Sequence, residues 1–507
     1  MVKNNIKEKI IFLSLQRIST GEAMNYRKDN YWYDDELLNS VGRYEEMIKN
    51  HTRCFFDVHE FEDIIDYYLD TEDFIQASQV VDYAVSIYPS ATSLQLRMAE
   101  IMIDKSQPVK ALSILNQLEH LESAEYGVFL LKGAALNMLG RPKEAHRQFE
   151  KAISLADENK IEVLYNIGIS FERINQHKVA LKYFLKVQAM EPDNYYVSYD
   201  LAYCYERLND LEKSVTYYHK YLDEDPFSEH VWYNLGIVYN KKDDNLKAVE
   251  AYDYALAINE DYSSAHFNRA NTLALLDRHR EAIVAYKEVI RIEPENASAF
   301  CYMGECYERL EDYDLAIVHY LKALAFDDKF TDAWFGLGIV KLQTGDSEEG
   351  IRDIQRAIEL DNQNTEYLFS LASAYANRQQ YDKAVEIFKL LVQYITSDIT
   401  MWDCFAQAYA KQNIYNDAQK VIMEALHFNP DSVMLRYRLA AYYLLNHDCI
   451  QGLAVLKEAL DKQPEESDCF FEMFDSEIHD EEILALVEKF KINESPDSNT
   501  NNEPTDI

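Results

Sequence analysis

Hydrophobic and polar residues follow one pattern along most of this chain, and the pattern returns every 34 residues. One copy carries Trp232, Gly236, Tyr239, Ala248 and Tyr252, and the same spacing recurs earlier and later. With Trp232 at position 4, repeats begin at residues 58, 92, 126, 161, 195, 229, 263, 297, 331, 365, 399 and 433. These twelve repeats end at residue 466, with one residue inserted near residue 160. A period of this length predicts an array of similar units.

Two positions of the repeat are almost always occupied by small residues. Position 8 is glycine or alanine in every repeat except the first, which has Ile65, and position 20 is small throughout. Because two helices approach closely only where the facing side chains are small, we expect positions 8 and 20 to meet within one helix pair. Position 24, and mostly position 11, carries a large apolar residue such as Phe149 or Phe171, which should fill the space between neighbouring pairs.

The prolines agree with this register. Six of them fall at position 32, where a helix should end: Pro89, Pro192, Pro226, Pro294, Pro430 and Pro464. Pro108 and Pro142 fall at position 17, at the expected start of a second helix, where proline is tolerated. No proline therefore interrupts a predicted helix.

This pattern of tryptophan, leucine, glycine, tyrosine and alanine resembles the tetratricopeptide repeat family over about four-fifths of the chain. The resemblance implies an all-α fold, a right-handed α-solenoid of about twelve 34-residue helix-turn-helix units with helical end caps. It also implies that first helices line a concave groove and that the ligands are peptide segments of other proteins. The stretch from Phe55 to Tyr68 is similar to the first unit of acidic cytosolic bacterial members, which implies no known chemistry.

The two ends of the chain differ from the array. We expect an N-terminal extension with a capping helix over residues 1–57, the array over 58–466, capping helices over 467–490 and a disordered acidic tail over 491–507. Asp34 and Asp35 are candidate N-cap residues of the first capping helix. The apolar residues at helical spacing in this helix are Leu37, Leu38, Val41, Tyr44 and Ile48. They should cover the open face of the first helix pair.

Further expectations concern the outermost residues. Residues 1–23 carry more basic than acidic residues, and Met24 opens an acidic stretch, so Met24 is a candidate native start that N-terminal sequencing would decide. Near the other end, Phe470, Phe471 and Phe474 form an aromatic cluster. Capping of the last repeat is favoured for this cluster over docking of a partner.

Composition narrows the class of protein. Only 13 of the 507 residues are glycine, which disfavours turn-rich β-barrels and phosphate-binding loops. The formal net charge of −38 disfavours nucleic acid as a ligand, and the longest apolar run near the start is too short to span a membrane. Seven dispersed cysteines, with no pair two residues apart in a C-x-x-C motif, indicate a reducing, cytoplasmic environment.

The sequence gives little support for a catalytic or metal-binding function. His59 and Glu60 have no second histidine at the spacing of a helical zinc site, and the thirteen histidines do not cluster. Cys204, Cys301 and Cys306 fall where buried, structural thiols are expected. We therefore expect neither an enzyme nor a cofactor or metal.

The candidate groove residues follow from the positions that the family resemblance directs to the concave surface. These positions are 2, 5, 6, 9, 12 and 13, and they carry aromatic residues at 5, amides at 6 and basic residues at 13. Amides can satisfy both peptide groups of an extended ligand, and aromatic rings add apolar contact. The proposed peptide-binding residues are Tyr165, Asn166, Arg173, Tyr199, Asp200, Arg207, Tyr233, Asn234, Lys241, Phe267, Asn268 and Arg309.

A structural interpretation of the same residues stays open. The aromatic residues at position 5 can pack between adjacent first helices, and the charged residues at positions 12 and 13 can form ordinary ion pairs on a solvated surface. No repeat has lysine at position 5, so binding of acidic chaperone tails is disfavoured.

The function favoured by the sequence is a non-catalytic protein–protein interaction scaffold or adaptor that binds extended peptide segments in its concave groove. The acidic array favours basic partners, and neither nucleic acid nor a membrane is expected. One alternative is a self-assembling structural protein, and another is a subunit that positions substrates for a partner enzyme.

Overall fold

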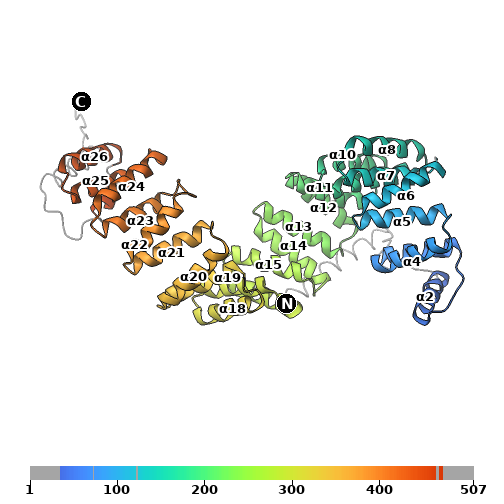
Figure 1. Cartoon of the computed structure of the whole chain (residues 1–507), viewed down its shortest axis with the longest axis horizontal. Helices are drawn as coiled ribbons and strands as arrows, with labels where there is room; N and C mark the ends of the chain where they lie inside the picture. Colours follow the sequence, from blue (N-terminus) through green and yellow to red (C-terminus); the bar gives the residue numbers. More distant parts are fainter. Residues whose placement is uncertain (1–34, 72, 122–123, 464–467, 472–507) are drawn as a thin grey trace, which may run out of the picture. The chain divides into compact units, whose positions relative to one another are not determined.

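Helices joined by short turns make up the structure, a computed structural model that describes residues 35–71, 73–121, 124–463 and 468–471 (Figure 1). These described residues contain no β-strand, and the prediction of an all-α repeat fold is confirmed. The chain divides into two compact parts, residues 1–276 and 277–507, called here the N-terminal part and the C-terminal part. Each part is described by itself.

The N-terminal part begins with one extra helix, and the repeats follow. Its helices are α2 (Asp35–Asn50), α3 (Val58–Asp70), α4 (Phe74–Ile87), α5 (Thr92–Asp104), α6 (Pro108–Leu121), α7 (Tyr126–Met138), α8 (Pro142–Leu155), α9 (Lys160–Arg173), α10 (His177–Met190), α11 (Tyr196–Arg207), α12 (Leu211–Glu224), α13 (Glu229–Lys241), α14 (Asn245–Ile258) and α15 (Ser263–Leu275). From α3 on, odd numbers mark the first helix of a repeat and even numbers the second.

The C-terminal part continues the alternation. Its helices are α16 (His279–Ile292), α17 (Ala297–Arg309), α18 (Tyr313–Phe326), α19 (Thr331–Gln343), α20 (Ser347–Leu360), α21 (Thr365–Asn377), α22 (Tyr381–Leu391), α23 (Ile399–Ala410), α24 (Tyr415–Phe428), α25 (Val433–Leu445), α26 (Cys449–Lys462) and the short α27 (Asp468–Phe471). Each first helix of the chain begins within one residue of position 1 of its repeat.

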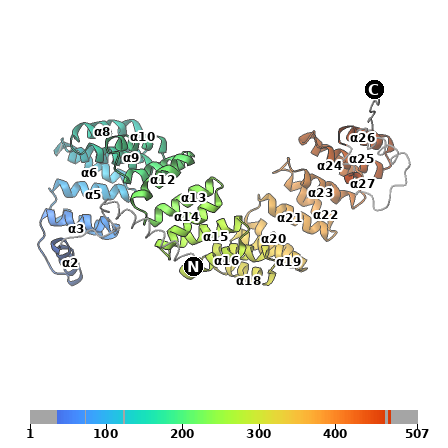
Figure 2. The same ribbon diagram turned by 180° about the vertical axis from the view of Figure 1, so that it is seen from behind.

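Within each part, consecutive helices from α2 to α26 pack against one another along the chain, and α27 packs against α25. First helices also contact the first helices of neighbouring repeats, as α5 and α9 both contact α7. The two opposite views show the helix pairs of the N-terminal part following one another in chain order (Figures 1 and 2). Stacking of this kind gives the first helices one shared surface within a part.

The turn inside the repeat has the same conformation at position 15 in the second to the twelfth repeat. Its φ is positive at Ser106, Gly140, Asn175, Asn209, Asp243, Asp277, Glu311, Gly345, Gln379, Asn413 and His447. In the turn at Glu311, the backbone N–H groups of Glu311 and Asp312 donate to the carbonyls of Glu308 and Tyr307, both at 2.9 Å. This reversed hydrogen-bond pattern ends the first helix and aims the second helix back along it.

The small residue at position 8 mainly leaves space for an aromatic ring at position 24 of the same repeat. Direct contact with the small residue at position 20 is less general. A Cβ built on Gly236 would lie 2.5 Å from Cε1 of Tyr252, the residue at position 24 of the same repeat. The expected contact between positions 8 and 20 occurs at Gly338, where an added Cβ would lie 2.8 Å from the carbonyl oxygen of Gly350. The sequence interpretation therefore identified the close approach but missed the ring that demands it at Gly236.

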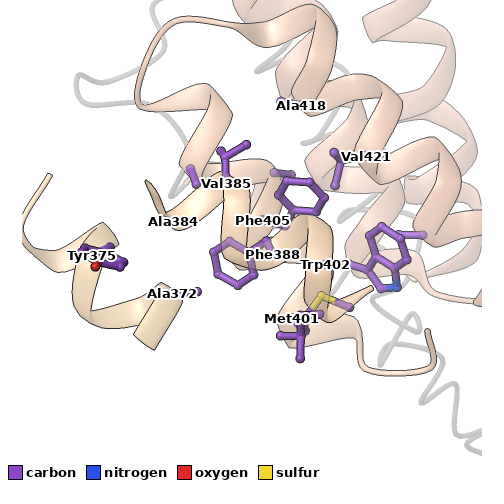
Figure 3. Close-up of a cluster of buried hydrophobic side chains, with 14 of the residues drawn as sticks. Ala372, Tyr375, Ala384, Val385, Phe388, Met401, Trp402, Phe405, Ala418 and Val421 are labelled. Carbon is purple, nitrogen blue, oxygen red and sulfur yellow. The ribbon is translucent and has the colours of Figure 1, made fainter. Parts of the chain in front are cut away.

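Large apolar residues fill the space between repeats, as predicted. In the C-terminal part, the ring of Phe388 at position 24 lies 5.6 Å from the ring of Phe405 in the next repeat (Figure 3). Trp402 and Met401 join the same buried cluster, and both side chains are almost fully buried. In the N-terminal part, the rings of Phe149 and Phe171 make the equivalent contact at 5.7 Å.

Tryptophans at position 4 connect consecutive repeats through a hydrogen bond. The indole N–H groups of Trp232, Trp334 and Trp402 each donate, at 2.9 Å, to a backbone carbonyl six residues earlier. That carbonyl belongs to position 32 of the preceding repeat, as at Pro226. A buried indole N–H is thereby satisfied, and the side chain fixes the connection between two repeats.

The described helices at the two ends of the array partly support the predicted capping. On α2, Val41, Tyr44 and Met47 are buried against the first repeat, whereas Leu38 and Ile48 are about half exposed. The contact of α2 with the first repeat therefore comes from one narrow stripe of this helix, and Leu38 and Ile48 lie outside that stripe. Phe470 of α27 is fully buried and packs against α25. The expectations for residue 474, for residues 483–490 and for residues 1–34 lie outside the described residues.

Candidate binding groove

A cavity of about 680 Å³ lies on the first-helix surface of the N-terminal part. Its lining comes mainly from four consecutive first helices, α3, α5, α7 and α9, with Leu118 from α6 and Glu125 from the turn before α7. On α5, the lining residues Leu96, Arg97 and Glu100 stand at positions 5, 6 and 9 of the repeat. Residues at this spacing share one face of a helix, so a repeated helix builds a continuous groove.

The floor of the groove is apolar. On α7, Leu130, Leu131, Ala134 and Met138 line the cavity, and Ile169 extends the apolar surface onto α9. Leu131 and Ile169 are half-buried, so part of each side chain remains open to the cavity. A floor of this composition offers hydrophobic contact to a ligand that also meets polar groups at the edges.

Acidic residues dominate the polar lining. Seven carboxylates face two guanidinium groups in the cavity; the carboxylates are Glu62, Asp63, Asp66, Glu100, Asp104, Glu125 and Glu162. The guanidinium of Arg97 pairs with Asp66 at 2.9 Å and with Glu100 at 3.0 Å, and Arg173 pairs with Asp104 at 2.7 Å. Both arginines are therefore engaged by carboxylates of the groove itself.

The remaining four carboxylates stand at the two ends of the groove. On α3, Glu62 and Asp63 lie 3.6 and 3.9 Å from the exposed imidazole of His59. Glu125 caps the backbone N–H of Gly127 at 3.3 Å. Among the described residues, neither Glu125 nor Glu162 forms an ion pair. The groove thus carries an excess of negative charge on either side of an apolar floor.

Of the twelve residues predicted to bind peptide, two line this cavity. Asn166 and Arg173, at positions 6 and 13 of α9, both contribute to its wall. The other residues of the predicted set that lie in the N-terminal part follow on α9, α11, α13 and α15. Arg309 belongs to α17 of the C-terminal part, which is described by itself.

The tyrosines and the amides of the predicted set bind one another. The amide N–H groups of Asn234 and Asn268 donate, at 3.0 Å, to the hydroxyls of Tyr199 and Tyr233 in the preceding repeats. Tyr165 and Asp200 form the same pair with the direction reversed, because the hydroxyl of Tyr165 donates to the carboxylate of Asp200. Position 6 of one repeat is thus tied to position 5 of the repeat before it, which supports a structural role for these pairs.

Ring packing gives the aromatic residues a second structural role. The rings of Tyr199 and Tyr218 lie 5.9 Å apart, and those of Tyr233 and Tyr252 also lie 5.9 Å apart, so position 5 covers position 24 of its own repeat. Phe267 at the same position is likewise half-buried. Position 5 therefore packs on the second helix of its own repeat, whereas the packing interpretation expected it between adjacent first helices.

The basic residues of the predicted set are placed differently from one another. Lys241 pairs with Glu206 of the preceding repeat at 2.7 Å, and Arg309 stands 4.0 Å from Glu305 one turn earlier. Arg207 is exposed at the end of α11. Exposed pairs of this kind stabilise a protein by at most about 1 kcal/mol, and each remains accessible to a ligand.

Two neighbouring carboxyls on the same surface have unusual acidity. Burial, together with the nearby charge of Asp200, raises the pKa of Glu172 to about 7. Burial raises the pKa of Asp200 to about 6, although the hydrogen bond from Tyr165 opposes this shift. The thiol of Cys204 lies 3.8 Å from the Glu172 carboxylate, and burial raises the pKa of that thiol. The cluster therefore titrates near neutral pH.

The sequence reasoning missed the acidic residues of the groove, although their signal was present. Glu62, Asp63 and Asp66 occupy positions 5, 6 and 9 of the first repeat, which belong to the positions already assigned to the concave surface. The aromatic residues at position 5 and the amides at position 6, on which the predicted set was based, begin only at the fourth repeat. Acidic side chains at the same positions indicate a different ligand chemistry in the first repeats.

Chemistry beyond binding finds no support in the described residues. No group of three or more histidine, cysteine, aspartate or glutamate side chains gathers there in a metal-binding arrangement. Within the described part, no helix has the length and hydropathy needed to cross a membrane.

Comparison with known proteins gives the following similarities. Family models described as tetratricopeptide repeat match residues 165–229, 233–297, 297–330 and 335–398, and a model for anaphase-promoting complex subunit 5 matches residues 92–171. No curated protein matches the chain.

Solved structures of repeat proteins are similar at low identity. MamA is 21% identical, over 33% of this chain and 92% of that chain, with a TM-score of 0.31. The Cut9–Hcn1 hetero-tetramer of APC/C is 14% identical, over 80% and 93%, with a TM-score of 0.38. YrrB, described as having an unusual peptide-binding site, is 24% identical, over 37% and 96%, with a TM-score of 0.32.

Proposed function

This chain belongs to the tetratricopeptide repeat family, and from that premise we propose that it is a non-catalytic scaffold that binds segments of other proteins. The observation that carries the proposal is the groove formed by α3, α5, α7 and α9. It combines an open apolar floor with an excess of carboxylates over guanidinium groups, and it extends over four consecutive repeats. A surface of this kind suits an extended peptide better than a small substrate.

The proposal includes a location and a class of partner. Six cysteines of the described residues are free thiols, which agrees with a reducing cytoplasm. The excess of carboxylates in the groove and the net charge of −38 favour basic segments of other proteins as ligands. Self-assembly through the C-terminal aromatic cluster is not favoured, because Phe470 is already fully buried.

A matched pair of substitutions tests the groove. Ile169 and Ile237 both stand at position 9 of a first helix and are both half-buried, but only Ile169 lines the cavity. We expect Ile169→Gln to lose the proteins that the unchanged chain retains in an affinity pull-down, because a polar amide replaces part of the apolar floor. The Ile237→Gln variant should retain them.

The measurement is the stoichiometric recovery of co-purified proteins by mass spectrometry at low and moderate salt. Circular dichroism of both variants checks that each remains as helical as the unchanged chain. Equal recovery by the unchanged chain and both variants would show that the groove does not bind these partners.

A further inference from the structure

Resting on the proposed function, we infer that the groove selects an extended segment with a basic residue near each end and apolar residues between them. The groove supplies three separate surfaces along one line of first helices, and each constrains a different part of the ligand. Together these surfaces define a pattern of ligand side chains that is narrower than a net positive charge.

The first surface is the acidic end on α3. Glu62 and Asp63 are adjacent in sequence, and in the described structure their only basic neighbour in ion-pair range is His59, whose side chain is 82% exposed. The guanidinium of Arg97 also interacts electrostatically with Glu62, but its ion pairs are with Asp66 and Glu100. A lysine or arginine of the ligand placed here gains two charge-assisted hydrogen bonds without displacing a basic residue of the protein.

The second surface is the far end, formed by Glu125 before α7 and Glu162 in the first turn of α9. Both residues are exposed, and both carboxylates are open to a cation from the ligand. Because Glu125 already accepts the N–H of Gly127, its side chain is held in place at the rim. This end therefore offers a second, positioned site for a basic side chain.

The third surface lies between the two ends and does not attract charge. Leu96, Leu130, Leu131 and Ile169 form the apolar floor. The guanidinium of Arg97 beside them is engaged by Asp66 and Glu100. An acidic ligand would have to compete with these carboxylates for the arginine, so the middle of the groove favours apolar side chains.

The distance between the ends sets the length of the segment. Along the first helices, Glu162 on α9 stands three steps from α3, and Glu125 before α7 stands two steps from it. Packed helices lie about 8–10 Å apart, so the span from α3 to Glu162 is about 25–30 Å, and an extended chain advances about 3.3 Å per residue. The two basic residues of the ligand should accordingly stand about eight residues apart.

A pair of synthetic peptides tests this pattern on the full chain. The first is a nine-residue peptide with lysine first, arginine last and alternating leucine and serine between them. The second has the same composition, but its lysine and arginine stand next to each other in the centre. Isothermal titration calorimetry at low and moderate salt should show the first peptide binding at least tenfold more tightly than the second.

Substitutions in the groove connect this preference to the two ends. The double variant Glu62→Gln with Asp63→Asn, and the double variant Glu125→Gln with Glu162→Gln, should each weaken the first peptide by about tenfold. The control Glu212→Gln with Asp223→Asn removes the same charge from α12, outside the cavity, and should leave the affinity unchanged. Circular dichroism checks the folding of all three proteins.

The outcomes separate this inference from the proposed function. Equal affinity for the two peptides, or equal weakening by all three double variants, overturns the two-ended pattern. In that case, loss of partners in the Ile169→Gln pull-down would still support the groove as a protein-binding site. Failure of the Ile169→Gln test itself would remove the proposed function and this inference with it.

Discussion

At the scale of single residues, the carboxyls of Glu172 and Asp200 make the stability of the first-helix surface depend on pH. Burial raises both pKa values, to about 7 and about 6, whereas carboxyls in an unfolded chain titrate near 4. Between pH 4 and 7 the folded chain therefore holds protons that the unfolded chain has released. Stability from these groups is fully present below pH 4 and is lost as the pH rises through 6 and 7.

The substitution Glu172→Gln should therefore stabilise α9 and α11 at pH 8 and change little at pH 5. We expect a gain of about 1 kcal/mol at pH 8, a value reduced for the partial exposure of this side chain. Hydrogen exchange of the α9 and α11 amides at both pH values measures the effect. Glu162→Gln, an exposed substitution on the same helix, is the control. An equal effect of Glu172→Gln at the two pH values would contradict the assignment.

At the scale of the secondary-structure element, the turn at position 15 decides how each helix pair closes. Its left-handed backbone suits glycine, asparagine and aspartate, and most repeats have one of these residues there. Glu311, with a φ of 60°, is an exception in the C-terminal part. A glutamate in this conformation carries steric strain of about 1 kcal/mol because its Cβ approaches the backbone.

The substitution Glu311→Gly should stabilise the pair α17 and α18 by about 0.5–1 kcal/mol, since relief of strain exceeds the entropic cost of glycine. Hydrogen exchange of the α17 and α18 amides reports the local free energy of opening. Asn413→Gly, with a φ of 62° at the same position, serves as the comparison and should change stability little. A loss of stability in Glu311→Gly would mean that the glutamate side chain makes contacts worth more than the strain.

At the scale of the whole molecule, the described contacts are local in sequence. The main helix contacts are with the next helix along the chain or the helix after that, and the ion pair between Arg173 of α9 and Asp104 of α5 is an exception that reaches across two repeats. Stability in such an array is approximately a sum over repeats and the interfaces between them. A severe defect in one repeat should consequently remain near that repeat.

The substitution Gly236→Val tests this locality. The added side chain would collide with the ring of Tyr252, so we expect α13, α14 and their neighbours to lose protection from hydrogen exchange. The amides of α21 to α24 in the C-terminal part should exchange as in the unchanged chain. Simultaneous loss of protection in all helices would indicate one cooperative unit and contradict the additive description.

The fold was accessible from the sequence because each repeat solves the same packing problem. Alanines and glycines at positions 8 and 20 and rings at position 24 mark the buried faces, and the structure uses those faces as predicted. The side-chain contacts between neighbouring repeats were harder to predict from the sequence. The bond between Asn234 and Tyr199 depends on how two repeats are rotated against each other, which periodicity does not specify.

The candidate site was only partly accessible for a similar reason. The positions that face the groove were correctly anticipated on α9, where Asn166 and Arg173 line the cavity. The repeat positions alone do not indicate in which repeats the side chains leave an open cavity. A cavity forms where α7 presents short or flexible residues such as Ala134 and Met138, whereas later repeats fill the same surface with tyrosines.

The tryptophans that bond to the preceding repeat have a spectroscopic consequence. Each indole spans a junction between repeats, so its fluorescence reports whether that junction is intact. Trp402 is fully buried and should emit at short wavelength, whereas Trp232 and Trp334 are partly open to water. Trp232 lies in the N-terminal part, and Trp334 and Trp402 lie in the C-terminal part. A variant that keeps only Trp232, and another that keeps only Trp334 and Trp402, with phenylalanine at the remaining tryptophans including Trp32, would let denaturation of each part be followed by its own emission.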